Sequence, residues 1–211
     1  ATTCSKISQE LYTLMADEFG EVSEGQGEGV IGSSTMPQKV NSKVACNIMT
    51  VAARIRSQVS LAMEGMQSSH EGDAATNKMM SEALDTVCKA AYEVTSDMKT
   101  LVSELKLHPE KMRKNLEITN GLIVAENVMM ALAPVLGRQK AHDVLHHAAE
   151  VATGEKRNIF DILWSDDAVR ANISSQDLQA SLDPANYLGL CTQLTKEAIT
   201  RARDAATTLS K

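Results

Sequence analysis

The sequence is poor in aromatic residues, which make up 3% of its 211 positions. Aromatic side chains favour β-strands, so their scarcity argues against a fold built mainly from sheets. Methionine, by contrast, occurs 11 times, and its flexible side chain packs well between helices. The composition therefore predicts an all-α fold.

Long apolar runs and an excess of positive charge are also missing. No apolar run approaches the roughly 20 residues that cross a bilayer, so we expect no membrane partner. The formal net charge is -6. Because proteins that bind nucleic acid present concentrated basic surfaces, we expect no nucleic-acid partner. The charge balance favours a cytoplasmic protein.

Closely spaced cysteines are absent. The four cysteines are scattered along the chain, at Cys4, Cys46, Cys88 and Cys191. Zinc sites and redox motifs space their cysteines closely, so we expect reduced thiols. His142 and His146 lie four positions apart, which suits a metal on one helix face, but no third ligand with suitable spacing accompanies them. We therefore expect no metal site.

Apolar residues recur every three or four positions in two long stretches, residues 44–66 and 80–105, with the same heptad spacing. This spacing predicts two long helices that pack side by side at shallow angles. A shorter stripe from Ile7 to Met15 predicts an earlier helix. The connector at residues 67–76 is polar, which predicts a turn rather than core.

Shorter helices are predicted in the second half of the chain. One apolar stripe, at residues 122–136, is stopped by Gly137, a residue that favours helix ends. Another stripe is stopped near Gly154. Ser174, followed three positions later by Asp177, predicts a capped helix start.

A domain boundary is predicted at His108-Pro109, because proline suits the first position of a new helix. We assign residues 1–107 to the last part of a long-helix bundle, with a functional loop at residues 20–41. Residues 108–211 are assigned to a compact helical C-terminal domain.

The most informative segment is residues 32–41, which read Gly-Ser-Ser-Thr-Met-Pro-Gln-Lys-Val-Asn. Gly32 lets the backbone approach a ligand, and consecutive N–H groups can form a nest for an anion. Ser33 and Ser34 offer hydroxyls that carry protons, while Lys39 and Asn41 offer a charge and directed hydrogen bonds to a carboxylate. The pattern indicates proton transfer next to a carboxylate. The alternative is a serine-rich turn that caps the next helix.

This segment resembles the signature loop of the fumarase/aspartase superfamily, which includes adenylosuccinate lyase, fumarase, aspartase and 3-carboxy-cis,cis-muconate cycloisomerase. The family pattern is Gly-Ser-Ser-x-Met-Pro-x-Lys-x-Asn, and every fixed position is met. The family usually continues with proline, whereas this chain has Ser42. The region from Leu107 to Gly189 resembles the muconate cycloisomerases and, more distantly, the adenylosuccinate lyases. The resemblance covers nearly the whole chain but only the second half of a typical subunit.

The resemblance implies a role for each matched residue. Ser33 would be the general base that removes a proton from the carbon next to a carboxylate. The residues that would line the loop and bind the substrate are Ser34, Thr35, Met36, Lys39 and Asn41. The resemblance also implies that no metal or organic cofactor is used. It further implies a homotetramer whose active sites are shared between subunits.

His70 is a further candidate for the substrate site. Related enzymes carry His-Glu-Arg in the connector between their long helices, and this chain reads His70-Glu71-Gly72. Without the arginine, the guanidinium fork that grips a phosphate or carboxylate is missing. A solvated turn is an equal alternative for His70.

Residues 20–29 are rich in glycine and glutamate, which predicts a mobile loop that leads into the signature. The two interpretations are a solvated linker and a lid that closes over substrate. For Glu21 and Glu24, a solvated acidic run is a simpler account than an ordering role.

The resemblance implies an elimination, or its reverse, on a small dicarboxylate. A 3-carboxy-cis,cis-muconate cycloisomerase-like enzyme is the first choice, and adenylosuccinate lyase or an unassigned lyase of the superfamily is the alternative. A catalytically silent helical assembly protein, as some crystallin relatives are, is the alternative of another class. The family's general acid histidine belongs to the first half of a subunit, so we expect this polypeptide alone to be inactive.

Overall fold

The computed structural model describes residues 1–25 and 42–210, and helices dominate them, which confirms the all-α prediction. The chain divides into two compact units, Ala1–Arg113 and Lys114–Lys211. The assignment of functional domains to residues 1–107 and 108–211 stays a prediction.

Three helices and two very short strands make up most of the first unit. Their bounds are α1 Thr2–Leu14, β1 Val22–Ser23, α2 Val44–Glu64, α3 Ala74–Glu104 and β2 Lys106–Leu107. The helix α4, Pro109–Leu116, begins at the proline that the sequence marked as a helix start.

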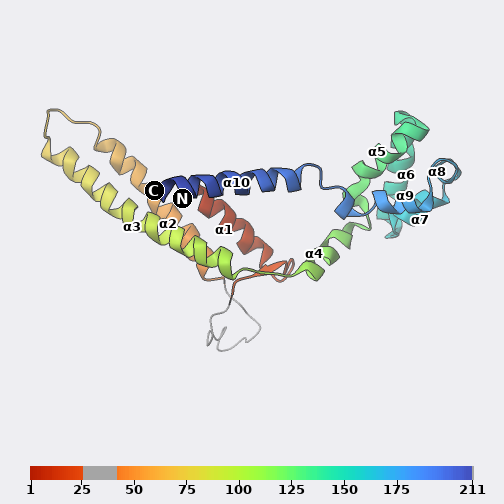
Figure 1. Cartoon of the computed structure of the whole chain (residues 1–211), viewed down its shortest axis with the longest axis horizontal. Coiled ribbons are helices and arrows are strands. Elements are labelled where there is room, and N and C mark those ends of the chain that lie inside the picture. The colour runs from red at the N-terminus through yellow and green to blue at the C-terminus, as the bar shows by residue number, and fades with distance from the viewer. Residues whose placement is uncertain (26–41, 211) are drawn as a thin grey trace. The chain divides into compact units, whose positions relative to one another are not determined.

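Helices α2 and α3 lie side by side along their length, and α1 packs beside them (Figure 1). Two clusters of buried residues join the three helices. One contains Val51, Ala52, Ala90 and Val94, and the other contains Ala45, Ile48 and Leu101. The small side chains in these clusters allow close approach of the helix backbones. The pair of long packed helices predicted from the heptad spacing is therefore confirmed.

The helix α3 starts earlier than the apolar stripe indicated. Asp73 is its N-cap, and its carboxylate accepts hydrogen bonds from the backbone N–H groups of Ala75 and Thr76 at 2.9 and 3.4 Å. The Ser69 hydroxyl also donates to this carboxylate at 3.0 Å. The cap allows the helix to begin at Ala74, six residues before the stripe at residue 80.

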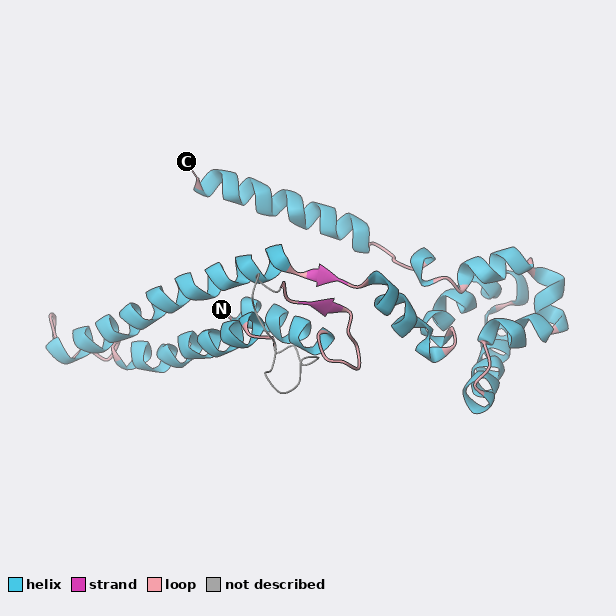
Figure 2. Ribbon diagram, turned by 90° about the horizontal axis from the view of Figure 1, so that it is seen from below, coloured by secondary structure: helices cyan, strands magenta, loops and turns pink. Residues whose placement is uncertain are grey.

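The strands β1 and β2 form an antiparallel pair that the sequence analysis did not predict (Figure 2). Val22 pairs with Leu107, and Ser23 pairs with Lys106. A strand of two residues is too short to show an alternating pattern, so periodicity cannot reveal it. The pair holds the chain before residue 26 against the chain that follows α3.

The second unit is built from shorter helices around one core. Their bounds are η1 Glu117–Thr119, η2 Leu122–Val124, α5 Ala125–Leu136, α6 Arg138–Glu155, α7 Ile159–Ser165, α8 Asp167–Asn172, α9 Ser175–Ser181, η3 Pro184–Asn186 and α10 Cys191–Leu209. The buried core consists of Val128, Leu132, Ala141, Leu145, Ala148, Ala152, Ile159, Ile162, Leu163, Val169 and Leu178. Helix α10 exposes all of its residues among those described.

Several helix ends in this unit confirm the sequence predictions. Gly137 ends α5 with a φ of 81°, a backbone conformation that glycine adopts without strain. The Ser174 hydroxyl caps α9 by accepting from the N–H of Asp177 at 3.0 Å. Helix α6 ends at Glu155, next to Gly154 as predicted, and Lys156 takes the left-handed position that follows it.

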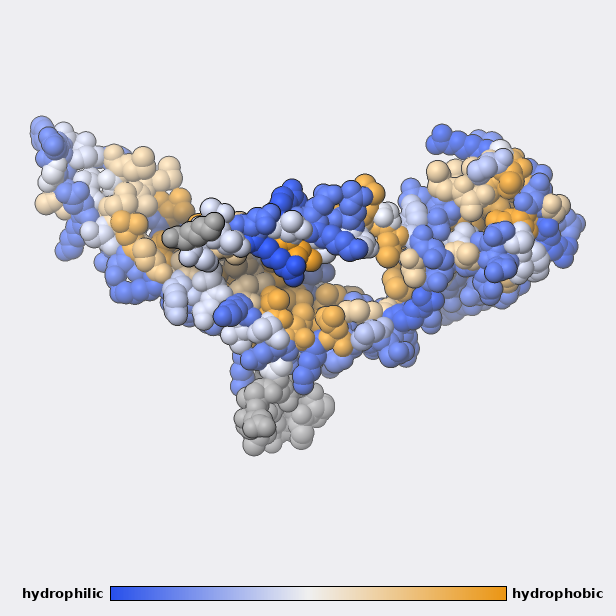
Figure 3. All heavy atoms as spheres, viewed as in Figure 1, coloured by the Kyte–Doolittle hydropathy of each residue, from blue (hydrophilic) through white to orange (hydrophobic). Residues whose placement is uncertain are grey.

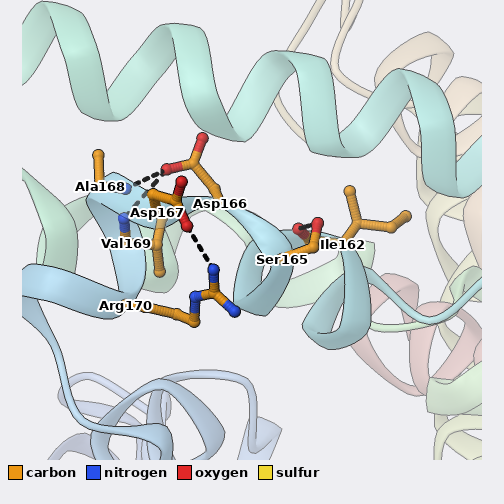
Figure 4. Close-up of polar contacts among 7 residues, drawn as sticks. All are labelled: Ile162, Ser165, Asp166, Asp167, Ala168, Val169 and Arg170. Atoms are coloured by element: carbon orange, nitrogen blue, oxygen red, sulfur yellow. Dashed lines mark hydrogen bonds and ion pairs between the residues drawn. The ribbon is translucent and has the colours of Figure 1, made fainter.

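Helix α8 shows why a short helix can be stable in this unit (Figure 4). The Asp166 carboxylate accepts from the N–H groups of Ala168 and Val169 at 2.8 and 3.1 Å. Arg170 forms an ion pair with Asp167 one turn away. Val169 is fully buried in the core, so the capped turn is also anchored by packing.

Apolar side chains reach the surface along the α2–α3 pair (Figure 3). They are Val59, Met63, Met66, Met79, Leu84, Tyr92 and Val102, and Tyr92 is the most exposed of them at 78%. Among the described residues, no single helix is long and apolar enough to span a membrane. The segments Pro109–Thr119 and Leu122–Leu136 meet that test only as a pair, with a bend of 82° between them.

Candidate active site

The predicted catalytic segment lies outside the described residues. This holds for Ser33 and for the predicted substrate-binding residues Ser34, Thr35, Met36, Lys39 and Asn41. The structure does describe the chain on either side of this segment, up to Gly25 and again from Ser42.

Glu24 joins the two ends. Its carboxylate accepts hydrogen bonds from the backbone N–H groups of Lys43 at 2.9 Å, Val44 at 3.2 Å and Ala45 at 2.8 Å. The hydroxyl of Ser42 donates to the same carboxylate at 2.5 Å. These N–H groups belong to the start of α2, where a helix has no carbonyl partners of its own for them.

This contact makes Glu24 the cap of a helix that begins about twenty residues later in the chain. Helix α2 has no acidic residue in its first turn, and its own N-cap, Lys43, makes no side-chain capping bond. A carboxylate at this position satisfies orphan donors and interacts favourably with the helix dipole. The interpretation of Glu24 as part of a solvated acidic run is therefore wrong.

Ser23 and His108 fix the residue before this cap. The Ser23 hydroxyl and His108 Nε2 lie 3.0 Å apart, within hydrogen-bond distance. The His108 N–H donates to the backbone carbonyl of Glu21 at 2.9 Å. The strand β1 is thus tied to β2 and to the start of α4 by both main-chain and side-chain contacts.

Gly25 lies too close to the end of α3 to be replaced by a larger residue. A Cβ atom at this position would lie 2.7 Å from Glu104 Cβ and 2.8 Å from the Glu104 carbonyl oxygen. Real Cβ atoms essentially never approach other atoms so closely, so even alanine would displace the backbone. Residues 23, 24 and 25 are therefore each held by a different element.

His70 lies at the opposite end of α2 from Glu24. It belongs to the exposed connector between α2 and α3, where its carbonyl accepts from the Ser68 hydroxyl at 2.7 Å. Helix α2 has 21 residues, so it is roughly 30 Å long. Within the described part of one chain, His70 and the cap at Glu24 are therefore separated by the length of this helix.

No group of three or more His, Cys, Asp or Glu side chains is arranged to hold a metal within residues 1–25 and 42–210. The rings of His142 and His146 stack with centroids 5.9 Å apart. Their Nδ1 atoms lie 3.3 Å from Asp143 and 3.7 Å from Glu150, respectively. The cysteines are all free.

Sequence reasoning missed Glu24, Ser23 and His108 as parts of one arrangement. One weak signal pointed to Glu24, which is one of three glutamates shortly before the signature, with Glu21 and Glu28. Because the partners lie some twenty positions apart, the 3.6-residue helix period says nothing about them. Ser23 and His108 are 85 positions apart, and the sequence shows no pattern that relates them.

Two protein families match the chain. The Lyase family matches residues 1–57, and the family described as the adenylosuccinate lyase C-terminus matches residues 121–198. The first match contains the signature segment and the capped start of α2. The second match covers the core of the second unit.

The chain is also similar to curated proteins over most of its length. It is 30% identical to trans-aconitate decarboxylase 1 of Mycosarcoma maydis, covering 96% of this chain and 41% of that protein. It is 33% identical to 3-carboxy-cis,cis-muconate cycloisomerase of Pseudomonas aeruginosa, covering 90% and 41%. It is 32% identical to adenylosuccinate lyase of Pyrococcus horikoshii, covering 94% and 44%. The chain thus spans less than half the length of these relatives.

Solved structures agree with these matches. The crystal structure of 3-carboxy-cis,cis-muconate lactonizing enzyme from Pseudomonas putida is 29% identical, with a TM-score of 0.87. That alignment covers 95% of this chain and 44% of the other. The family matches, the relatives and the shared fold all point to one group of proteins. The chain belongs to the fumarase/aspartase superfamily of lyases and cycloisomerases.

Proposed function

We propose that the complete enzyme to which this chain belongs is a cofactor-independent lyase or cycloisomerase. It removes a proton from the carbon next to a carboxylate of a small dicarboxylate. The observation that carries this proposal is the signature at residues 32–41, in which every fixed position of the family pattern is met. The signature also falls inside the region matched by the Lyase family.

In the proposed mechanism, Ser33 is the general base. A serine hydroxyl is a weak base, so its alkoxide needs a nearby cation and backbone N–H groups that stabilise negative charge. Lys39 supplies the cation, and Asn41 holds the substrate carboxylate by directed hydrogen bonds. The electrons of the broken C–H bond pass into the adjacent carboxylate. They then return to expel the substituent on the next carbon, or the same steps run in reverse.

The substrate we propose is a compound like 3-carboxy-cis,cis-muconate, which carries the two carboxylates that the proposed reaction needs and a third. The substrates named for the relatives are trans-aconitate, 3-carboxy-cis,cis-muconate and adenylosuccinate, and each carries at least two carboxylates. Adenylosuccinate is the second candidate. It is second because the region from Leu107 to Gly189 resembles the adenylosuccinate lyases more distantly than the muconate cycloisomerases. Gly72, which stands where related enzymes carry an arginine, counts against both substrates, because a guanidinium binds phosphate and carboxylate alike.

We further propose a homotetramer whose active sites combine segments of different subunits, in the cytoplasm. Two observations support the assembly. Apolar side chains are exposed along α2 and α3, including Tyr92 at 78% and Leu84 at 54%. In addition, helix α2 separates His70 from Glu24 by roughly 30 Å within one chain. If both belong to one active site, the simplest arrangement brings His70 of one subunit close to the signature segment of another.

The experiment that tests this function is replacement of Ser33 with alanine in the complete enzyme. Turnover is measured by ultraviolet absorbance with carboxymuconate, adenylosuccinate and fumarate-derived adducts. We expect Ser33→Ala to lower kcat by about 10²–10⁴-fold, the usual contribution of a general base, with helicity and assembly unchanged.

Ser34→Ala is the matched control, and it should retain much more activity than Ser33→Ala. If Ser33→Ala turned over at a near-normal rate, the role of Ser33 as base would be contradicted. If the wild-type protein turned over none of the dicarboxylates, a catalytically silent helical assembly protein would become the better account.

A further inference from the structure

We propose that Glu24 is a positioning residue for the reaction assigned to Ser33: its carboxylate fixes the two ends of the signature segment relative to each other. This inference rests on the function proposed above. Glu24 lies outside the signature pattern, and the contacts of its carboxylate are all with described residues.

The first step is that one carboxylate holds both ends of the segment. Glu24 lies before residue 26, and its four donors lie on residues 42–45. Both carboxylate oxygens are used, since Oε1 accepts from Ser42 and Ala45 while Oε2 accepts from Lys43 and Val44. Hydrogen bonds to an ionised acceptor are stronger than neutral ones, so this bridge is a firm one.

The second step is that Glu24 is itself held in place. Its neighbour Ser23 contacts His108, and its other neighbour Gly25 lies against the end of α3. The carboxylate therefore projects from a backbone that β2, α3 and α4 locate. A fixed residue that binds a fixed helix start therefore sets the relative positions of Gly25 and Ser42, the described residues on either side of the signature segment.

The third step is that this chain departs from its family at one of the bridging positions. Where the family usually has a proline after the signature asparagine, this chain has Ser42, and the Ser42 hydroxyl makes the shortest of the four hydrogen bonds. Proline could not make this bond because it has no hydroxyl. The substitution therefore exchanges a stiff residue for an additional link to Glu24.

The positioning role of Glu24 can be separated from its contribution to stability. Helix α2 is anchored by residues buried against α1 and α3, so loss of its cap should not unfold the unit. Proton abstraction, in contrast, depends steeply on geometry, and a displacement of about 1 Å can slow a reaction by about 100-fold. Loss of the bridge should therefore affect turnover much more than it affects stability.

The test uses Glu24→Gln in the complete enzyme. Glutamine keeps the size of the side chain but removes the charge and replaces one acceptor oxygen with an amide NH2 group, which can only donate. We expect kcat to fall by about 10–100-fold, with a smaller change in KM, while the melting temperature falls by about 2–4 °C. Glu82→Gln is the control, because Glu82 is exposed on α3 and its side chain makes no hydrogen bond or ion pair with residues 1–25 and 42–210. It should change neither quantity.

A second variant distinguishes positioning from simple helix capping. In Glu24→Gln with Ser42→Asp, the new aspartate can accept from the N–H groups of Val44 and Ala45 and so restore a local cap. We expect this double variant to recover the melting temperature but not kcat, because residue 24 still lacks the carboxylate that holds both ends of the segment. Recovery of kcat together with the melting temperature would overturn the proposal.

Comparison with Ser33→Ala shows which idea has failed. If Ser33→Ala is inactive while Glu24→Gln turns over at the wild-type rate, the positioning role is wrong and the proposed function stands. If Ser33→Ala is fully active, the proposed function is wrong, and the positioning role falls with it.

Discussion

Asp73 and Glu24 show that single carboxylates set the starts of both long helices in this chain. Asp73 caps α3 from the residue directly before it, whereas Glu24 caps α2 from across the signature segment. Both supply negative charge to N–H groups that would otherwise lack partners. The two caps differ in their sequence distance from the helix that they cap. Only Asp73, which directly precedes its helix, gives a recognisable sequence pattern.

The cap at Asp73 makes a prediction about pH. The hydrogen bond from the Ser69 hydroxyl, followed by those from the N–H groups of Ala75 and Thr76, lowers the pKa of the Asp73 carboxyl below its usual value of 3.8. A lowered pKa in the folded state means that the cap stabilises the fold above pH 3.8. This stability is lost as the pH falls through the lower, folded-state value.

We therefore expect an NMR titration of the folded protein to give Asp73 a pKa below 3.8. The melting temperature of Asp73→Asn should fall less in acid than that of the wild type, because asparagine caps the helix but does not titrate. Ser69→Ala should raise the Asp73 pKa by removing the strongest donor. A value for wild-type Asp73 at or above 3.8 would contradict the account.

At the scale of elements, two glycines of the second unit should respond in opposite ways to the same substitution. Gly121 has a φ of 92°, and a Cβ atom there would lie 2.8 Å from Ile159 Cγ2. Gly154 lies in α6, where a Cβ atom would meet nothing within 4 Å. We expect Gly121→Ala to lower the free energy of unfolding by about 1–3 kcal/mol.

Gly154→Ala should instead raise the free energy of unfolding by about 0.5–1 kcal/mol. Urea unfolding measures both, and equal effects of the two changes would refute this reading.

The helix α5 gives a second pair of variants that tests where the core lies. Leu132 is fully buried in the core of the second unit, whereas Met130 on the same helix is 64% exposed. Leu132→Ala should lower the free energy of unfolding by about 2–5 kcal/mol, because it removes packed methyl groups and leaves a cavity. Met130→Ala should change it by less than about 0.5 kcal/mol. A large effect at Met130 in urea unfolding would mean that this side of α5 is covered.

The sequence alone predicted the features that depend on local or periodic signals. The apolar stripes located α2 and α3, Gly137 marked the end of α5, and Ser174 marked the cap of α9. Helix α3 began earlier than its stripe because Asp73 caps a first turn that has few apolar residues. The bridge made by Glu24 could not be predicted in the same way, because its partners are brought together by the fold.

At the scale of the whole molecule, we expect the complete enzyme to sediment as a tetramer. The exposed apolar side chains of α2 and α3 would then lie between subunits, where aromatic residues contribute most to binding. Tyr92→Asp should shift the sedimentation coefficient toward smaller species and lower activity in parallel, because the proposed sites are shared. Lys89→Gln, a polar change on the same helix, is the control. An unchanged tetramer in Tyr92→Asp would show that this part of α3 is not an interface.

The central claim is that a serine hydroxyl in the signature segment removes a proton from carbon next to a carboxylate. The most direct measurement is hydrogen exchange at that carbon in D₂O, followed by NMR with the complete enzyme and the dicarboxylate that it turns over. We predict that wild-type enzyme introduces deuterium at this position and that Ser33→Ala does so at least about 100-fold more slowly. Exchange by Ser33→Ala at the wild-type rate would contradict the claim.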